Sequence, residues 1–474
     1  MAKSFDVVVI GAGPGGYPAA IRSAQLGKKT AIIETKWMGG ECLNWGCIPS
    51  KALISAANFY QRATKDAQEM GITFGDAKVD FLKLQSWKKA IQDKQINGVG
   101  QLLKGNKVEV ILGTAKFKSS KVVEVVTESG STEEVTGTNF VISTGASFIS
   151  IPGFQIDEKD IISAKGALEL DKIPEELIII GGGIIGLELG GVYLKLGSKV
   201  TVVELLDEIL PGVDPSLIRV VKKHLRQEGM VFHTASSGKS WSKTNNGKLE
   251  LEVTSKKEGS FKLQADKILL SVGKKASTQN LGLDKAGVNT DQRGFISTNT
   301  KQQTNVPSIY AVGDCTGMPF LAHRAMKQGV VAAEVIAGLA SESDFKSIPG
   351  AIFTEPEIAF TGLTEEEAKN KGYDVATGRV AFAINAKAQA HQMSEGFVKV
   401  VMDKKTELLL GVQMVGPEVS NLISEAALAL EMGSVVEEVA FTIHPHPTLS
   451  EVVMEACEAA LGKAIHTMNP LKRD

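Results

Sequence analysis

The sequence predicts an α/β protein with two copies of one strand–turn–helix–strand unit, followed by a separate α+β domain. Three observations lead to this prediction. A short apolar run enters a glycine-rich turn near the N-terminus, the same pattern recurs from residue 177, and the chain changes to mixed strands and helices from residue 348. At 474 residues the chain is too long for one hydrophobic core, so we expect two to four domains.

The first unit starts with an apolar run at residues 5–10, which is typical of a parallel strand buried on both faces. Gly11, Gly13 and Gly16 follow the strand and open an alanine-rich helix. Glycines in this pattern let the backbone approach a pyrophosphate, and the helix N-terminus offers free N–H groups. Glu34 closes the next strand, where a carboxylate can accept the hydroxyls of an adenosine ribose.

The second unit repeats this arrangement with Gly181, Gly183, Gly186 and Glu204. The acid lies 23 residues beyond the first glycine in both units. One such glycine pattern is weak evidence, because glycines also serve turns and close helix packing. Two copies with the same spacing to an acid predict two dinucleotide sites in two Rossmann-like domains.

Glu204 also bears on the choice of nicotinamide coenzyme. Its carboxylate would repel a 2′-phosphate, which needs an arginine nearby. The residues after it, 205–208, include two more acids, and no arginine lies between Glu204 and Arg219. The sequence therefore favours NAD(H) over NADP(H).

The remaining elements are predicted from hydrophobic periodicity. Residues 58–103 predict two amphipathic helices split near 71–80, and the serine- and lysine-rich tract 236–248 predicts a surface turn region. Strands are also predicted at 108–112, 121–126, 249–254, 267–272, 396–401 and 408–415, and late helices at 421–431 and 450–464.

Cys42 and Cys47 are the residues that most directly suggest chemistry. Five residues of regular helix rise ~7.5 Å, whereas a disulfide tolerates a Cα separation of at most about 6.8 Å. The pair must therefore lie where a helix begins or is distorted, which Gly46 and Pro49 permit. From the residues alone the pair is a redox dithiol, two buried thiols or two metal ligands, although no nearby Cys or His completes a metal site.

Composition narrows the class of protein. The net charge of −2 gives no general attraction to nucleic acid or anionic membrane, and no apolar run of about 18 residues is present. The first strand starts at Phe5, so we expect no signal peptide. Four cysteines are too few for a secreted disulfide scaffold. A reducing compartment is expected: the cytoplasm, or the mitochondrial matrix for a processed eukaryotic chain.

Residues 39–51 resemble the active-site segment of the pyridine nucleotide-disulfide oxidoreductases, flavoproteins of the glutathione reductase type. They are most similar to the branch that oxidises dihydrolipoamide. Residues 143–146 resemble the family's crossing between domains, 311–314 its second FAD fingerprint, and 443–451 its C-terminal catalytic segment. The resemblance covers nearly the whole chain and implies a glutathione reductase-like fold. The implied domains are FAD-binding (1–147 and 276–347), NAD-binding (148–275) and dimerisation (348–474).

The resemblance implies FAD and NAD as cofactors and no metal. Asp314 matches the residue that hydrogen-bonds the ribityl chain, and Lys51 with Glu188 matches a charge pair beside the flavin ring. The implied cofactor-binding residues are Gly11, Gly13, Gly16, Glu34, Lys51, Thr144, Gly145, Asp314, Gly181, Gly183, Gly186, Glu188, Glu204 and Gly273.

The implied catalytic residues are Cys42, Cys47, His446 and Glu451. A carboxylate five residues from an imidazole can orient it as a thiol base. The resemblance implies that Cys42 meets the substrate, that Cys47 lies nearer the flavin, and that His446 comes from the second subunit of a homodimer. The implied partners are lipoyl domains of 2-oxo acid dehydrogenase complexes or the glycine-cleavage H protein. His444 is expected to make an accessory contact.

Three other functions compete with this one. A glutathione-type reductase would use NADPH, which Glu204 disfavours. A mercuric reductase would need a thiol pair in the tail 469–474, which contains no cysteine. A flavin-bound scaffold without turnover would not need the four catalytic residues. The chain departs from the family at Trp45, Pro18, Lys274–Lys275 and Glu355, which we expect to lie outside the chemistry.

Overall fold

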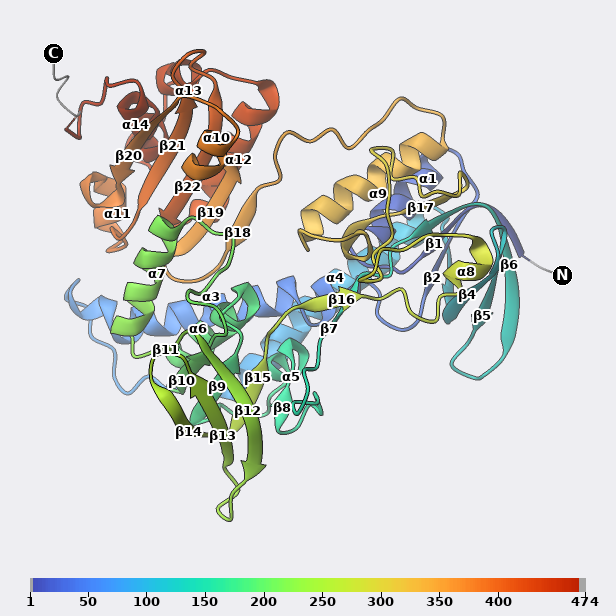
Figure 1. Cartoon of the computed structure of the whole chain (residues 1–474), viewed down its shortest axis with the longest axis horizontal. Helices are drawn as coiled ribbons and strands as arrows, with labels where there is room; N and C mark the ends of the chain where they lie inside the picture. Colours follow the sequence, from blue (N-terminus) through green and yellow to red (C-terminus); the bar gives the residue numbers. More distant parts are fainter. Residues whose placement is uncertain (1–2, 469–474) are drawn as a thin grey trace.

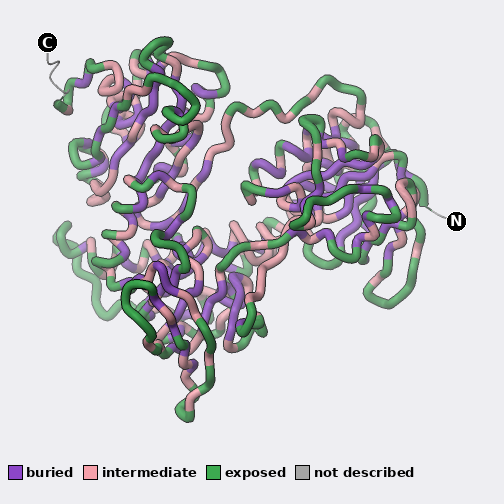
Figure 2. Tube along the Cα trace, viewed as in Figure 1, coloured by how far each residue is buried: buried purple, intermediate pink, exposed green. Residues whose placement is uncertain are grey.

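The computed structural model describes residues 3–468 and shows three bodies, each built around a β-sheet (Figure 1). The first sheet lies at the right of the view, the second below, and the C-terminal sheet at the upper left. Buried residues concentrate within each of the three bodies (Figure 2). The tail 469–474 lies outside the described residues.

The first sheet has seven strands, and its parallel part forms around the apolar N-terminal strand. The hydrogen-bonded order is β3 (Glu109–Leu112), β2 (Thr30–Glu34), β1 (Lys3–Ile10), β6 (Thr132–Ile142), β5 (Val122–Val126) and β4 (Thr114–Ser119), with β17 (Ile309–Ala311) also paired to β6. Strands β1, β2, β3, β6 and β17 run parallel to one another, whereas β5 pairs in antiparallel fashion with both β6 and β4. Helices α1 (Gly16–Gln25) and α9 (Ala322–Ile336) pack against each other beside this sheet. The first predicted unit is therefore confirmed.

The segment after β2 forms helices rather than strands. It comprises α2 (Gly40–Asn44), α3 (Cys47–Thr64), a short 3₁₀ turn (Asp66–Gln68) and α4 (Phe81–Gly105). The predicted split between two helices is confirmed. Helix α3 packs against α4 and also against α6 of the second body, so it joins two parts of the molecule.

The second sheet repeats the strand order of the first, as the repeated motif predicted. Its five parallel strands are β11 (Val231–His233), β10 (Lys199–Val203), β9 (Glu176–Ile180), β15 (Lys267–Leu270) and β8 (Ile161–Ile162). Its helices are α5 (Ala164–Leu168), α6 (Ile184–Lys195) and α7 (Pro215–Gln227).

A three-stranded antiparallel sheet inserts between β11 and β15. It consists of β12 (Ser236–Lys243), β13 (Leu249–Ser255) and β14 (Gly259–Ala265). The prediction of a turn region over 236–248 was wrong for most of that tract. β12 lies at the edge of this sheet, where backbone pairing with β13 supports a strand whose polar side chains largely face solvent.

The chain crosses between the first two bodies twice, and the crossings pair with each other. β7 (Ala146–Phe148) leads out of the first body, and β16 (Lys274–Ala276) leads back into it. They form a two-stranded antiparallel ribbon, with Lys275 opposite Ser147. After the ribbon come α8 (Leu283–Ala286), β17 and a 3₁₀ turn (Gly313–Thr316).

The C-terminal sheet is antiparallel, which gives the α+β character predicted for this region. Its strands are β18 (Gly350–Ile352), β19 (Glu357–Gly362), β22 (Leu409–Gly416), β21 (Phe397–Asp403) and β20 (Val375–Ala381). Its helices are α10 (Glu365–Asn370), α11 (Ala386–Ala390), α12 (Val419–Met432), α13 (Val436–Phe441) and α14 (Glu451–Ala460).

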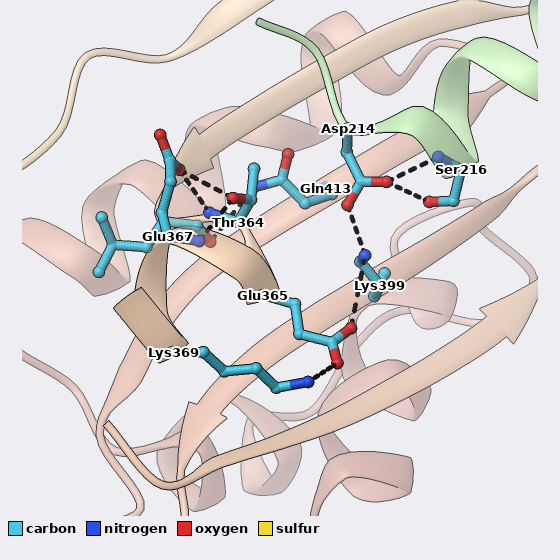
Figure 3. A network of polar contacts seen from close by, with 9 residues as sticks. Asp214, Ser216, Thr364, Glu365, Glu367, Lys369, Lys399 and Gln413 are labelled. Atoms are coloured by element: carbon cyan, nitrogen blue, oxygen red, sulfur yellow. Dashed lines mark hydrogen bonds and ion pairs between the residues drawn. The ribbon is translucent and has the colours of Figure 1, made fainter. Parts of the chain in front are cut away.

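A buried ion pair joins the second body to the C-terminal sheet. Asp214 caps the N-terminus of α7 by accepting hydrogen bonds from the backbone N–H (2.7 Å) and hydroxyl (2.6 Å) of Ser216. Its other carboxylate oxygen accepts a hydrogen bond from Lys399 on β21, which also approaches Glu365 (Figure 3). Burial opposes ionisation of Asp214, but the bonds from Lys399 and Ser216 outweigh it and lower the pKa of this carboxyl.

Lys88 on α4 is a buried lysine at the contact with α5. Its ammonium group donates to the backbone carbonyl of Leu168, at the C-terminus of α5, and to Gln85. Burial is the main cause that lowers the pKa of Lys88, to about 8.

This burial predicts a pH-dependent stability. Between the lowered folded pKa near 8 and the unfolded value of about 10.4, the unfolded chain binds a proton that the folded chain does not, so stability rises with pH. The melting temperature of the parent protein should therefore rise relative to that of Lys88→Met as the pH increases from 8 to 10. Lys89→Met removes a neighbouring exposed lysine and should give no such trend, and a parallel course of the parent and Lys88→Met curves would contradict the prediction.

Candidate active site

In the first glycine turn, contacts within the chain leave no room for a Cβ at two of the glycines but leave room at the third. Gly11 has φ +97°, and a Cβ there would lie 2.3 Å from the carbonyl oxygen of Ser143. A Cβ on Gly16 would lie 1.8 Å from the carbonyl oxygen of Gly11. At Gly13 a Cβ would meet only the Cα of Gly40, at 3.8 Å. Packing within the chain therefore does not explain Gly13, whereas close approach of a pyrophosphate does.

The second turn repeats this division. Gly181 has φ +104°, with a Cβ 2.2 Å from the carbonyl oxygen of Ser271, and a Cβ on Gly186 would lie 2.6 Å from that of Gly181. A Cβ on Gly183 would meet nothing within 4 Å. The space over the middle glycine in both turns fits a dinucleotide.

Each unit has one acid at the end of its second strand, and the two acids are buried and accept the same kind of hydrogen bond. Glu34 accepts a hydrogen bond from the backbone N–H of Ala12 (2.8 Å), and Glu204 accepts one from Gly182 (2.6 Å). In both units the donor is the residue after the first glycine. This bond holds the carboxylate at the edge of the glycine turn, where a ribose would lie. Leu206, which donates its backbone N–H to Glu204, has an exposed side chain.

Other predicted cofactor residues lie around the first body and its crossings. Gly145 (φ +71°) and Gly273 (φ +118°) flank the crossing ribbon in conformations that favour glycine. The hydroxyl of Thr144 is buried and has no hydrogen-bond partner in the chain. Burial raises the pKa of Asp314, against the attraction of Lys274. An unpartnered buried hydroxyl and a half-buried carboxyl fit a polar cofactor chain such as ribityl.

Lys51 and Glu188 form a charge pair between α3 and α6. The Lys51 ammonium donates to Glu188 Oε2 at 2.7 Å, and Glu188 is 5% exposed. Phe353, which the sequence analysis did not single out, fixes both partners. Its backbone N–H donates to Glu188 Oε1 (2.9 Å), and its ring lies 4.4 Å from the Lys51 ammonium.

Cys42 and Cys47 lie on either side of a helix break, as the disulfide geometry predicted. Cys42 is in α2 and Cys47 is the first residue of α3, with Trp45 and Gly46 between the helices. A Cβ on Gly46 would lie 3.0 Å from the carbonyl oxygen of Glu41, so glycine relieves a close approach here. Both cysteines are free thiols, and each lies close enough to the other to shift its pKa.

The surroundings favour a thiolate on Cys47. The hydrogen bond from Cys42 lowers the pKa of Cys47, burial opposes this effect, and the Lys51 ammonium adds to it. The same hydrogen bond and burial raise the pKa of Cys42. The N-terminus of α3, where Cys47 stands, also favours a negative charge. The pair is thus differentiated into one thiolate-forming and one protonated sulfur.

His446 and Glu451 meet in the C-terminal body. His446 Nδ1 lies 2.8 Å from Glu451 Oε1, and the backbone N–H of Thr448 donates to Glu451 Oε2 at 2.8 Å. Burial opposes ionisation of Glu451, but the Thr448 and His446 hydrogen bonds prevail and lower its pKa. The His446 side chain is 76% exposed, so its Nε2 edge is open to a substrate or a second chain. The predicted pairing of these two residues is present.

His444 has a different role from His446. Its side chain is 4% exposed, with Nε2 2.8 Å from Glu425 and Nδ1 2.7 Å from the carbonyl oxygen of Thr442. The Glu425 hydrogen bond is the main cause that raises the pKa of His444. This histidine anchors the segment that carries His446, and Glu425 was not predicted from the sequence because the two lie on separate elements.

One departure from the family pattern lies nearer the chemistry than expected. Lys274 forms an ion pair with Glu41, the residue before Cys42. Trp45 stacks edge-on against Trp37, with centroids 5.1 Å apart. Lys274 therefore contacts the redox segment through the residue that precedes Cys42.

The other two departures are accommodated. Glu355 pairs with Lys195. Pro18 is the third residue of α1, within the first helical turn, where a missing N–H costs little.

Exposed apolar side chains precede His446 in the chain. Phe441 is 87% and Ile443 95% exposed. Further exposed apolar residues of the C-terminal body are Leu428, Met432, Ile465 and Met468. Several exposed large apolar side chains in one domain are typical of an interaction surface.

Comparison with known proteins agrees with this geometry. Residues 5–329 match the family described as pyridine nucleotide-disulphide oxidoreductase, and residues 348–457 match its dimerisation domain. The chain belongs to the pyridine nucleotide-disulphide oxidoreductases. The predicted family and fold class are thereby confirmed, and the cofactors are FAD and NAD(H).

Similar members of this family are known from several organisms. A dihydrolipoyl dehydrogenase of Haloferax volcanii is 44% identical over 99% of both chains, and one of Bacillus subtilis is 44% identical over 97% of both. Among solved structures, LpdA from Mycobacterium tuberculosis has a TM-score of 0.89 at 27% identity over 96% of this chain and 99% of its own. The flavoprotein disulfide reductase RclA from Escherichia coli has a TM-score of 0.85 at 25% identity, covering 96% and 99%.

No helix among residues 3–468 is both long and apolar enough to cross a bilayer. Within the same range, no group of three or more His, Cys, Asp or Glu side chains is placed to hold a metal ion.

Proposed function

We propose that this protein oxidises dihydrolipoamide with NAD+, using Cys42 and Cys47 as the electron-accepting disulfide. The observation that carries the proposal is the placement of Cys42 and Cys47 on either side of the break between α2 and α3, with Cys47 at the N-terminus of α3. It is supported by the hydrogen-bonded His446–Glu451 pair and by the relatives named dihydrolipoyl dehydrogenase. In its site FAD supplies a two-electron carrier between the thiol pair and NAD+.

The chain's own residues account for the thiol chemistry. In the oxidised enzyme, His446 takes the proton from one substrate thiol, and Glu451 stabilises the imidazolium that forms. The substrate thiolate attacks Cys42 Sγ, which forms a mixed disulfide and releases Cys47 as a thiolate. The second substrate thiol then gives up its proton and attacks the substrate sulfur bonded to Cys42. The bond to Cys42 breaks, Cys42 takes up that proton, and lipoamide leaves as a cyclic disulfide. The Lys51 ammonium and the α3 N-terminus hold the negative charge left on Cys47.

We propose that each active site is shared between the two subunits of a homodimer. The exposed imidazole of His446 and the exposed side chains of Phe441 and Ile443 belong to the region that matches a dimerisation domain. Burial of Phe441 and Ile443 against a second copy would bring His446 to the partner's thiols. Residues 1–147 and 276–347 would then bind FAD, 148–275 NAD, and 348–474 the second subunit.

We also propose that the substrate is carried on a partner protein. Lipoyl domains of 2-oxo acid dehydrogenase complexes and the glycine-cleavage H protein present the required dithiol on a flexible arm. A cytoplasmic location, or the mitochondrial matrix for a processed chain, suits a thiol pair that cycles between reduced and oxidised forms.

The direct test compares two reactions of the purified protein. Oxidation of dihydrolipoamide by NAD+ should exceed reduction of glutathione disulfide by NADPH by about four orders of magnitude, the scale of discrimination expected when the wrong substrate leaves polar groups of the site unpaired. A reversed preference would favour the glutathione-type alternative. Turnover of neither substrate pair by FAD-loaded protein would favour the scaffold.

Replacement of Glu204 should weaken the preference for NAD(H). Glu204→Gln removes the charge while keeping the shape, so we expect the KM for NAD+ to rise about tenfold, the scale of one charged hydrogen bond. The ratio of NAD+ to NADP+ turnover should fall, because the repulsion of a 2′-phosphate is lost. Glu252→Gln on β13 is a control outside the glycine turn and should leave both values unchanged. An unaltered coenzyme ratio in Glu204→Gln would place the ribose elsewhere.

A further inference from the structure

Glu41 and Lys274 form an ion pair beside the redox thiols. Glu41 lies in the first turn of α2, immediately before Cys42, and Lys274 begins the returning crossing strand β16. The ammonium of Lys274 contacts Glu41 Oε1. The lysine side chain is 12% exposed and the glutamate 25%. Lys275, the next residue, faces solvent.

This ion pair is largely buried, and a gain in stability does not explain it. Removal of two charges from water costs about as much as their attraction returns, so a buried ion pair contributes little net free energy. The pair also connects residues from different bodies: α2 beside the first glycine turn, and β16 at the return from the second body. Its location next to Cys42 points to an effect on the sulfur chemistry.

The titratable groups that act on the thiol pair lie on α1, α2 and α3. Lys51 on α3 stabilises the Cys47 thiolate, whereas Glu41 on α2 opposes it. Tyr17 on α1 is close to Cys42, and its phenol remains protonated because burial raises its pKa. Lys274 on β16 pairs with Glu41 and also attracts Asp314. Lys274 is thus the cation that offsets Glu41.

We propose that Lys274 is a positioning residue for the redox pair, because its ion pair with Glu41 holds that carboxylate and offsets its charge beside Cys42 and Cys47. Lys51 then acts on the Cys47 thiolate without an uncompensated carboxylate nearby. The proposal rests on the redox role of the two cysteines stated above. It deepens that role by assigning a function to two residues that the dithiol motif itself does not contain.

The sign of the effect follows from the charges. Loss of Lys274 leaves Glu41 as an uncompensated anion, which disfavours a second negative charge on sulfur. Loss of the Glu41 charge leaves Lys274 as an uncompensated cation, which favours the thiolate. A single nearby charge shifts a pKa by about one unit or more in such surroundings.

The test measures alkylation of the reduced holoenzyme by iodoacetamide as a function of pH, with peptide mass analysis to follow Cys42 and Cys47. The pH of half-maximal rate should rise by about one unit in Lys274→Met and fall by a similar amount in Glu41→Gln. The double variant Glu41→Gln/Lys274→Met should return to the parent value. Lys274→Arg should retain the parent value, and Lys275→Met, the matched exposed lysine, should not differ from it.

Each outcome decides the proposal. Shifts of Lys274→Met and Glu41→Gln in the same direction would indicate a structural role only and would overturn it, as would an unshifted Lys274→Met. If Lys274→Met does not fold, the downward shift in Glu41→Gln carries the test alone, and its absence contradicts the proposal. Alkylation requires no turnover, so failure of dihydrolipoamide oxidation in the parent protein would overturn the proposed function separately.

Discussion

Cys47→Ala should abolish oxidation of dihydrolipoamide by NAD+ while leaving FAD bound. Without Cys47 the attack on Cys42 has no disulfide to open, so the electron pair cannot leave the substrate. We expect a loss of at least about three orders of magnitude, the scale seen when a residue of a catalytic unit is removed. Steady-state turnover measures the loss, and the flavin absorbance of the purified variant measures retention of FAD.

Two controls separate lost chemistry from lost structure. Cys457→Ala removes a buried thiol on α14 and should remain active. Reduction of ferricyanide by NADH should survive in Cys47→Ala, since this reaction bypasses the thiols and uses only the bound cofactors. Normal dihydrolipoamide turnover in Cys47→Ala would end the proposed mechanism.

His446→Gln should lower dihydrolipoamide oxidation by about 10²- to 10⁴-fold, the usual contribution of a general base. Glutamine can still hydrogen-bond to Glu451, but it cannot take up the substrate thiol proton. NADH-driven ferricyanide reduction should be unchanged, because no thiol proton moves in it. His466→Gln is the matched control: His466 makes a similar contact with Glu455 (2.9 Å) in the same domain and should retain full activity.

A mixed dimer tests whether His446 serves the second subunit. Subunits carrying His446→Gln are combined with subunits carrying Cys47→Ala and purified through two different tags. If the base acts across the interface, one of the two sites has intact thiols and an intact histidine, and about half of the parent activity returns, because the two sites of a dimer are equivalent by symmetry. An inactive mixed dimer would show that base and thiols belong to the same chain.

The parallel sheets could be predicted because their signals are local. A strand buried on both faces must be a continuous apolar run, and the glycines after it follow a known spacing. Gly16 is required by the turn itself, since a Cβ there would collide with the carbonyl oxygen of Gly11, whereas a Cβ on Gly11 would collide with Ser143 beyond the end of β6. The edge strand β12 was missed for the opposite reason: its pairing depends on the backbone of β13, and its side chains carry no apolar alternation.

The site residues also divide into those close together in the chain, which could be predicted, and those brought together by packing, which could not. Cys42 with Cys47, and His446 with Glu451, are each within five residues in the chain, so local geometry already places them together. The Glu188–Lys51 pair needed a family resemblance, because 137 residues separate its partners. Phe353 and Glu425 carried no sequence signal, and Lys274 was noted only as a departure from the family, since each reaches its partner only through the packing of separate elements.

The sequence by itself determined the two glycine turns, the acids beside them and the dithiol segment, because chain connectivity alone keeps their atoms near one another. Folding decided which charges lie near the sulfurs, and it left the His446 side chain exposed in the C-terminal body. These features depend on contacts between residues far apart in the chain, and such contacts exist only once the three bodies have packed.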